Sequence, residues 1–261
     1  LNDFVIDATS IGIWQTGHST IVKYSGKGII TGTLEKALRI HRANFYSWDP
    51  GTLEIKDFRG GYGIDLMMSN ASIYNLDLLN FGDVGSGYNQ AISVNTNSSL
   101  ALEDAEISGS TDGVLVNISN GSIGEIRDST LTVGRADAGF QVDAGSRLNF
   151  SNSTISGSVT DNLMNIEEGS SAKIRESTIT ATTDGNSDSG IYLSETSTLE
   201  LRESKINASH RGLAVQRNSY AELRNGSSIT AGANSAVTVY GGAGLKIRSG
   251  SSVVSTGASA I

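Results

Sequence analysis

The side chains that most often carry out catalysis are few in this chain and are not spaced as catalytic groups. Its three histidines, His18, His41 and His210, have no metal-ligand spacing, and cysteine is absent. The Gly-x-Ser-x-Gly motif of serine hydrolases is also absent, and Ser170-x-x-Lys173 falls inside an ordinary repeat. We therefore expect no catalytic nucleophile, no metal and no cofactor.

Carboxylates are the other group that could act chemically, because a polysaccharide lyase or hydrolase needs a cluster of acids on one face. Asp65, Asp77 and Asp83 lie close together relative to the repeat length. Their positions within the repeat do not clearly coincide. A glycan-cleaving enzyme is kept as an alternative rather than the leading interpretation.

Aromatic residues are concentrated near the start of the chain, where 11 of the 16 lie before residue 90. The segments "NFYSWDPG", "FRGGYGID" and "FGDVGSGYNQ" also break the repeat described below. Exposed aromatic rings stack on sugars while Asn and Asp take hydrogen bonds from hydroxyl groups. The alternative is that these rings plug one end of the molecule. The candidate ligand-binding residues in this region are Trp48, Tyr62, Asp65, Asp83, Tyr88 and Asn89.

A sequence repeat must position all of these residues. Segments such as "IRESTI" and "LRESKI" recur with first residues 24, 24, 24, 27, 22 and 24 positions apart. These first residues are Leu102, Ile126, Phe150, Ile174, Leu201, Leu223 and Ile247. Each is preceded, usually by eight residues, by a second apolar-x-apolar pair such as Phe140 and Val142. In the second copy we assign this pair to Val114 and Val116, ten residues before.

Alternation with period two indicates strands, and three short strands per repeat cannot bury a core alone. Stacked on their neighbours, they form a continuous core. We predict an all-β fold, a parallel β-helix of the right-handed type, rather than a β-sandwich, which would not require a fixed period of about 24 residues. Residues 1–50 are expected to form an N-terminal cap and irregular first coils, with "TLEKALRIHRANF" as a short helix or a strand pair. Residues 51–261 are expected to form the β-helix, with the sequence stopping inside a further coil.

Outward positions also recur, and one of them collects arginines, including Arg175, Arg202 and Arg224. They could pair with the carboxylates interleaved among them or bind a sulfated or carboxylated polymer. The formal net charge of −8 argues against nucleic-acid binding through a generally basic surface. Serines at another recurring position, such as Ser153 and Ser177, are expected to satisfy backbone groups of the turns.

The segments "GANSAVTVYGGAGLKIRSGSSVVSTGASAI" and "SGIYLSETSTLELRESKINAS" resemble the passenger repeats of pertactin-like autotransporters of Gram-negative bacteria. The resemblance covers about residues 90–261. It implies a right-handed β-helix exported to the bacterial cell surface or shed, with contact to the membrane only through a barrel that would follow this sequence. Members are commonly adhesins. No binding residue carries over, because the shared positions are core and turn positions.

The leading prediction is a surface-exposed or secreted adhesin that binds a glycosaminoglycan or an extracellular-matrix glycoprotein along its flank. The alternatives are a polysaccharide lyase or hydrolase, a phage tailspike, and a passenger that associates with copies of itself in aggregates or biofilms.

Overall fold

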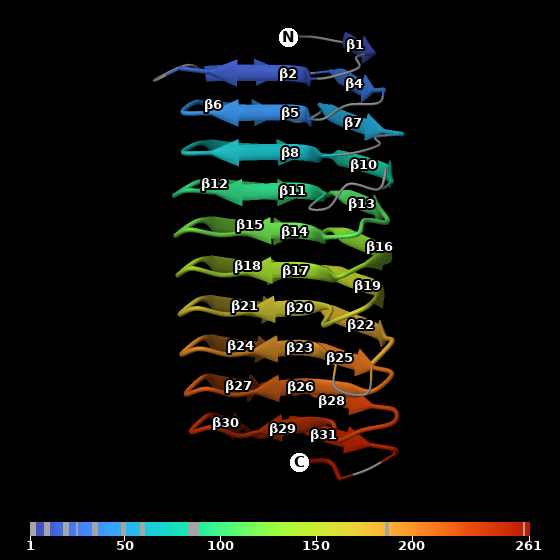
Figure 1. Cartoon of the computed structure of the whole chain (residues 1–261), viewed down its shortest axis with the longest axis vertical. Coiled ribbons are helices and arrows are strands. Elements are labelled where there is room, and N and C mark those ends of the chain that lie inside the picture. Colours follow the sequence, from blue (N-terminus) through green and yellow to red (C-terminus); the bar gives the residue numbers. More distant parts are fainter. Residues whose placement is uncertain are drawn as a thin grey trace.

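The chain forms stacked coils, each contributing one strand to each of three parallel sheets (Figure 1). The computed structural model describes residues 4–7, 11–17, 21–24, 26–32, 36–47, 51–57, 61–82, 89–185, 188–257 and 259–261. Within these ranges the regular elements are strands, and no helix has the length and apolar character needed to cross a membrane. The all-β prediction is confirmed.

The three sheets are named A, B and C in the order in which the chain enters them. Sheet A contains β1 (Phe4–Asp7), β4 (Lys27–Thr31), β7 (Thr52–Lys56), β10 (Leu76–Phe81), β13 (Glu106–Gly109), β16 (Thr130–Ala136), β19 (Thr154–Val159), β22 (Thr178–Thr183), β25 (Lys205–Ala208), β28 (Ser228–Ala231) and β31 (Ser252–Ser255). Sheet B contains β2 (Ile11–Thr16), β5 (Lys36–His41), β8 (Tyr62–Met67), β11 (Gln90–Asn95), β14 (Val114–Ile118), β17 (Ala138–Val142), β20 (Met164–Ile166), β23 (Ser189–Leu193), β26 (Arg211–Val215) and β29 (Val237–Val239). Sheet C contains β3 (Ile21–Tyr24), β6 (Asn44–Ser47), β9 (Asn70–Tyr74), β12 (Ser99–Glu103), β15 (Ile123–Arg127), β18 (Arg147–Ser151), β21 (Ser171–Arg175), β24 (Thr198–Arg202), β27 (Tyr220–Arg224) and β30 (Gly244–Ile247).

The repeat register read from the sequence matches the strand pairing in sheet C. Residues paired from coil to coil are Leu102, Ile126, Phe150, Ile174, Leu201, Leu223 and Ile247. In sheet B, one assignment was wrong. Ile92 pairs with Val116 and Val94 with Ile118, so the core pair of that coil is Val116 and Ile118. Val114 is the first residue of β14. Ile118 precedes Ile126 by eight residues, which is the usual offset in the other copies.

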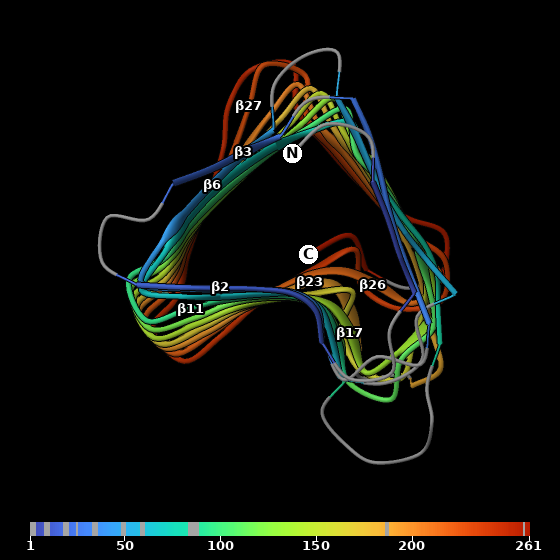
Figure 2. The same cartoon turned by 90° about the horizontal axis from the view of Figure 1, so that it is seen from above.

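The interior of the stack is aliphatic and is enclosed by the three sheets, which form a three-sided cross-section in Figure 2. Phe140 and Phe150 are both 0% exposed, and their rings meet edge to face with centroids 5.8 Å apart. Because each coil buries its inward side chains only against the coils above and below, the core runs continuously along the axis.

Interior serines hold two of the corners between sheets. At the corner from sheet C to sheet A, the amide N–H of Ser129 donates to Oγ of Ser153, and the amide of Ser153 to Oγ of Ser177, at 3.0 and 3.2 Å. A second series connects Ser122, Ser146 and Ser170 in the same way at the corner from sheet B to sheet C. These serine ladders provide acceptors for buried backbone donors at the corners. The predicted structural role of the turn serines is therefore confirmed.

The segment "TLEKALRIHRANF" contains a strand pair, β5 and β6, and the helix considered as its alternative is wrong. The described strands before residue 51 belong to the same three sheets as the later strands. Coils are therefore already present in the segment 1–50 that the sequence analysis assigned to a cap and irregular first coils.

Sheet B differs from the other two sheets because its strands bend. In Figure 2 the side containing β2, β11, β17, β23 and β26 has a corner within the sheet. The burial pattern shows the same bend. Consecutive residues of a straight strand point to opposite faces, but Gly139 and Phe140 of β17 are both buried. In β26 the bend needs a residue without a side chain, because a Cβ on Gly212 would lie 2.2 Å from Cγ2 of Ile229. The outer face of sheet B is consequently concave.

Candidate functional site

The outer face of sheet B carries one polar row along the axis of the molecule. In each strand, one residue lies between two core residues and points outward, and these residues pair from coil to coil. We call them the floor row: Arg39, Asp65, Ser93, Asn117, Gln141, Asn165, Tyr192, Ala214 and Thr238. Asp65 and Ser93 are each 5% exposed and Asn165 is 6% exposed, although all three point away from the core. The floor row therefore lies at the bottom of a concave face.

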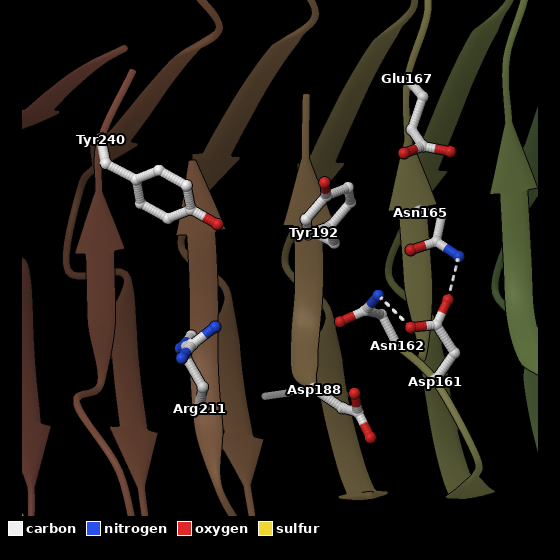
Figure 3. Close-up of a pocket in the computed structure, with 8 residues that line it drawn as sticks. All are labelled: Asp161, Asn162, Asn165, Glu167, Asp188, Tyr192, Arg211 and Tyr240. Atoms are coloured by element: carbon white, nitrogen blue, oxygen red, sulfur yellow. Dashed lines mark hydrogen bonds between the residues drawn. The ribbon is translucent and has the colours of Figure 1, made fainter. Parts of the chain in front are cut away.

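A cavity of about 500 Å³ lies on this face between β20 and β29 (Figure 3). Its lining is polar and contains two phenol rings. The lining residues are Asp161, Asn162, Asn165, Glu167, Asp188, Tyr192, Arg211 and Tyr240. The first four belong to the coil of β20, whereas the others come from the coils of β23, β26 and β29.

Asp161 orients two amide side chains in this cavity. Nδ2 of Asn162 donates to Oδ1 of Asp161 at 2.8 Å, and Nδ2 of Asn165 donates to Oδ2 at 3.2 Å. Since an ionised carboxylate only accepts hydrogen bonds, this contact identifies which end of the Asn165 amide carries the nitrogen. The Oδ1 atom of Asn165 is buried and has no hydrogen-bond partner among the described residues. The contact with Asp161 fixes the orientation of this amide, and Asn165 lines the cavity.

The two phenol rings belong to coils that are two apart in sheet B. Tyr192 is in β23 and Tyr240 directly follows β29, so the strand between them is β26. In β26 the floor row is Ala214, which is 0% exposed. Ala214 pairs with Tyr192 and with Thr238, and Tyr240 lies two residues after Thr238; Figure 3 shows both rings lining the cavity together with Arg211. Tyrosine rings separated in this way offer two apolar surfaces with hydroxyl groups at their ends.

Burial raises the pKa of the Tyr192 hydroxyl above its ordinary value, and the negative charge of Glu167 adds to this effect. The phenol is therefore neutral at physiological pH and can donate a hydrogen bond. Nε2 of Gln216 donates to the Tyr192 hydroxyl oxygen. This contact holds the ring beside Gln216, and Ser194 is a second hydrogen-bond partner of the hydroxyl.

The cavity is acidic. It contains the carboxylates of Asp161, Glu167 and Asp188 and one guanidinium, that of Arg211. Glu167 accepts hydrogen bonds from Gln141 at 3.1 Å and from Ser194 at 3.2 Å, so it links three coils. An excess of negative charge repels polyanions, whereas neutral hydroxyl-rich molecules are not repelled. In the parts of the chain that the structure describes, no group of three or more His, Cys, Asp or Glu could hold a metal ion.

Two of the predicted ligand-binding residues, Tyr62 and Asp65, lie together on the same concave face, in β8. The Lys36 ammonium lies 4.5 Å from the centroid of the Tyr62 ring and donates a hydrogen bond to Asp65. Nε of Arg39 is 3.6 Å from the same carboxylate. These charges partly cover Tyr62. Four strand spacings, about 19 Å, separate β8 from β20, so the pair is remote from the cavity.

The remaining predicted residues are dispersed. Asn89 is 3% exposed, and its Oδ1 accepts a hydrogen bond from the Gly61 amide at 2.8 Å, so it links neighbouring coils. Arg175, Arg202 and Arg224 lie in adjacent strands of sheet C and not on the concave face. Trp48, Asp83 and Tyr88 lie outside the residues that the structure describes.

Sequence reasoning missed Asp161, Asn165, Asp188, Tyr192 and Tyr240, because each stands in or beside an ordinary repeat. One signal was available. In "MNI" and "IYL" the middle residue between two core positions must point outward, and the same position holds Gln141 in the preceding copy. A row of large polar and aromatic residues at one outward position marks a surface that could bind a ligand.

Comparison with known protein families matches residues 90–252 to a family described as "Right handed beta helix region". The chain belongs to this right-handed β-helix family. The prediction of fold and handedness is thereby confirmed. Comparison with curated proteins found no match.

Membership of the right-handed β-helix family is compatible with adhesin, polysaccharide lyase and tailspike roles. It specifies none of them. The functional conclusion must therefore come from the chemistry of the concave face.

Proposed function

We propose that this right-handed β-helix is an adhesin that binds a hydroxyl-rich glycan along the outer face of sheet B. The glycan is either free or carried by an extracellular-matrix glycoprotein. Presentation at the bacterial surface, or secretion, rests on the resemblance of the repeats to autotransporter passengers.

The observation that carries the proposal is the Oδ1 atom of Asn165. A buried carbonyl oxygen without a partner is costly, by about 1–3 kcal/mol if water also fails to reach it. Asp161 fixes the orientation of this amide through the bond to Nδ2, and Asn165 is one of the residues that line the cavity. The oxygen is covered in the structure, so a sugar hydroxyl entering the cavity would donate to it once the covering side chains shift.

The rest of the cavity is suited to the same ligand class. Tyr192 and Tyr240 can stack on the C–H faces of sugar rings, while Asp161, Asp188 and Arg211 bind their hydroxyl groups. Strand positions repeat about every 4.8 Å along the axis, a spacing comparable to the length of one sugar unit in an extended chain. A polysaccharide lying parallel to the axis would meet the outward side chains of successive coils at that spacing. The acidic lining favours a neutral glycan over a glycosaminoglycan in this position.

A glycan array with the purified chain tests the proposal, followed by calorimetry with the best neutral oligosaccharide. Asn165→Ala and Tyr192→Ala are each expected to weaken binding by about tenfold or more, as central contacts do. Tyr220→Ala is the matched control, because Tyr220 is exposed on sheet C. Equal binding by all three variants, or no neutral glycan bound by the unmodified chain, would refute the proposal.

A second candidate, glycan cleavage, is favoured by Asp161 and Asp188, whose carboxylates line one cavity with Arg211. Paired carboxyl groups across a glycan-sized site are the groups that glycoside hydrolysis requires. The bound oligosaccharides from the calorimetry can be analysed for shorter products. Cleavage that disappears in Asp188→Asn would favour the enzyme, whereas intact oligosaccharide after long incubation favours the adhesin.

A further inference from the structure

The outer face of sheet C carries charged side chains, and most of its arginines are paired with carboxylates. Arg127 lies 2.9 Å from Glu125, and Arg202 lies 3.2 Å from Glu203. Arg224 lies 2.5 Å from Glu222, which also binds Arg248. These arginines are compensated by their neighbours and have reduced attraction for an external anion.

Three cations on the same face are different. Arg147, Lys173 and Arg175 are exposed, and none forms an ion pair within the described parts of the chain. We call them the cationic cluster. Arg147 lies in β18, whereas Lys173 and Arg175 lie two residues apart in the adjacent strand β21. Strands are about 4.8 Å apart and alternate residues about 6.7 Å apart, so Lys173 lies between the two arginines, whose Cα atoms are about 14 Å apart.

Short side chains leave room between the members of the cationic cluster. Asn149 pairs with Lys173, and Ser151 pairs with Arg175, in the strand register. Two hollows of about 410 and 560 Å³ lie here, and both are lined by Asn149 and Lys173. Arg175 lines the first and Arg147 the second. The hollows are therefore adjacent. Cations line both, and the first is also lined by Glu125, which is paired with Arg127.

The chemistry of the cluster is that of an oxyanion site. Guanidinium groups donate two parallel hydrogen bonds to a sulfate or carboxylate, and an ammonium adds a third charge-assisted bond. Asn149 lines both hollows and Ser171 the second, and their amide and hydroxyl groups can complete the coordination.

We infer that the cationic cluster binds the sulfate groups of a sulfated glycan, at a site separate from the cavity on sheet B. Carboxylates limit its extent, because Glu125 pairs with Asn149 on one side and Glu200 pairs with Lys173 on the other. They would repel a uniformly and densely charged chain such as a nucleic acid. A glycan with spaced sulfates can place one or two of them between these carboxylates.

The test uses the full chain with a heparin-derived oligosaccharide, its desulfated form and inorganic sulfate as probes, in calorimetry at physiological ionic strength. We expect the sulfated oligosaccharide to bind. Lys173→Gln combined with Arg175→Gln should weaken it by about tenfold or more, because charge-assisted bonds are lost. Arg202→Gln combined with Arg224→Gln is the matched control, since it removes the same charge from paired arginines of the same sheet, and should change binding by less than about twofold.

Several results would overturn the inference: no binding of the sulfated oligosaccharide, equal loss in the test and control variants, equal binding of the desulfated form, or tighter binding of single-stranded DNA of the same charge. Tyr192→Ala should leave this binding unchanged. The failure of the sheet B proposal and the failure of this inference are therefore distinguishable. Thermal unfolding of each variant, expected to show a folded chain at the temperature of the binding assay, excludes misfolding as the cause of lost binding.

Discussion

Replacement of Ser153 by alanine removes one step of the serine ladder at the corner between sheets C and A. Ser153 is 4% exposed, and its Oγ accepts a hydrogen bond from the Ser129 amide at 3.0 Å. The same Oγ donates to the carbonyl oxygen of Ser151 at 2.7 Å. Alanine fits the available space but provides neither bond.

The size of the expected effect depends on which hydrogen bonds the Ser151 carbonyl and the Ser129 amide keep after the substitution. The Ser151 carbonyl keeps a bond from the Asp128 amide at 3.2 Å, so it is not left without a partner. The Ser129 amide loses the serine acceptor, and Ser129 is itself 3% exposed. A buried donor without a partner costs about 1–3 kcal/mol, which corresponds to roughly 5- to 150-fold faster exchange of that amide.

Hydrogen exchange followed by mass spectrometry measures this effect on a peptide that contains Ser129. Local exchange is preferable to a global unfolding curve, because stacked coils need not unfold in a single step. Ser151→Ala is the control, since Ser151 points outward from sheet C and is only half-buried. We expect faster exchange in Ser153→Ala alone. Identical exchange in both variants would refute the assignment of the ladder as a source of stability.

Two further predictions concern the core and the charged face. Phe150→Ala removes a 0% exposed ring that contacts Phe140; chemical denaturation should show a loss of about 3–5 kcal/mol, and a loss as small as that of Phe150→Leu would contradict it. The ion pairs with Arg224 and Arg248 lower the pKa of Glu222 from 4.5 to about 2. Since the folded-state pKa lies below the unfolded one, this stabilisation is present above pH 4.5 and is lost as the pH falls toward 2. The melting temperatures of the unmodified chain and Glu222→Gln should therefore converge between pH 5 and 2, and a constant difference would exclude the mechanism.

The sequence by itself determined the fold, because the pattern that defines it is local and repeated. Leu102, Ile126 and Phe150 recur at intervals of 24 residues, and only the stacking of equivalent positions buries them together. The role of Ser153 and Ser177 followed from the same repeat. The wrong assignment of Val114 arose because Val114, Val116 and Ile118 all alternate with period two, so hydrophobicity alone allowed two registers.

The tertiary structure decided which outward residues are enclosed. Alternation predicts that Asn165 and Tyr192 point away from the core, but the concavity of sheet B depends on a bend that every coil must share. It also decided which cations remain free. Arg175 and Arg224 occupy the same column in the sequence repeat, yet Arg224 has Glu222 and Glu200 within reach and Arg175 has no carboxylate partner among the described residues. Both outcomes depend on side chains from three or more coils meeting in space, and a pattern read along one coil does not contain that information.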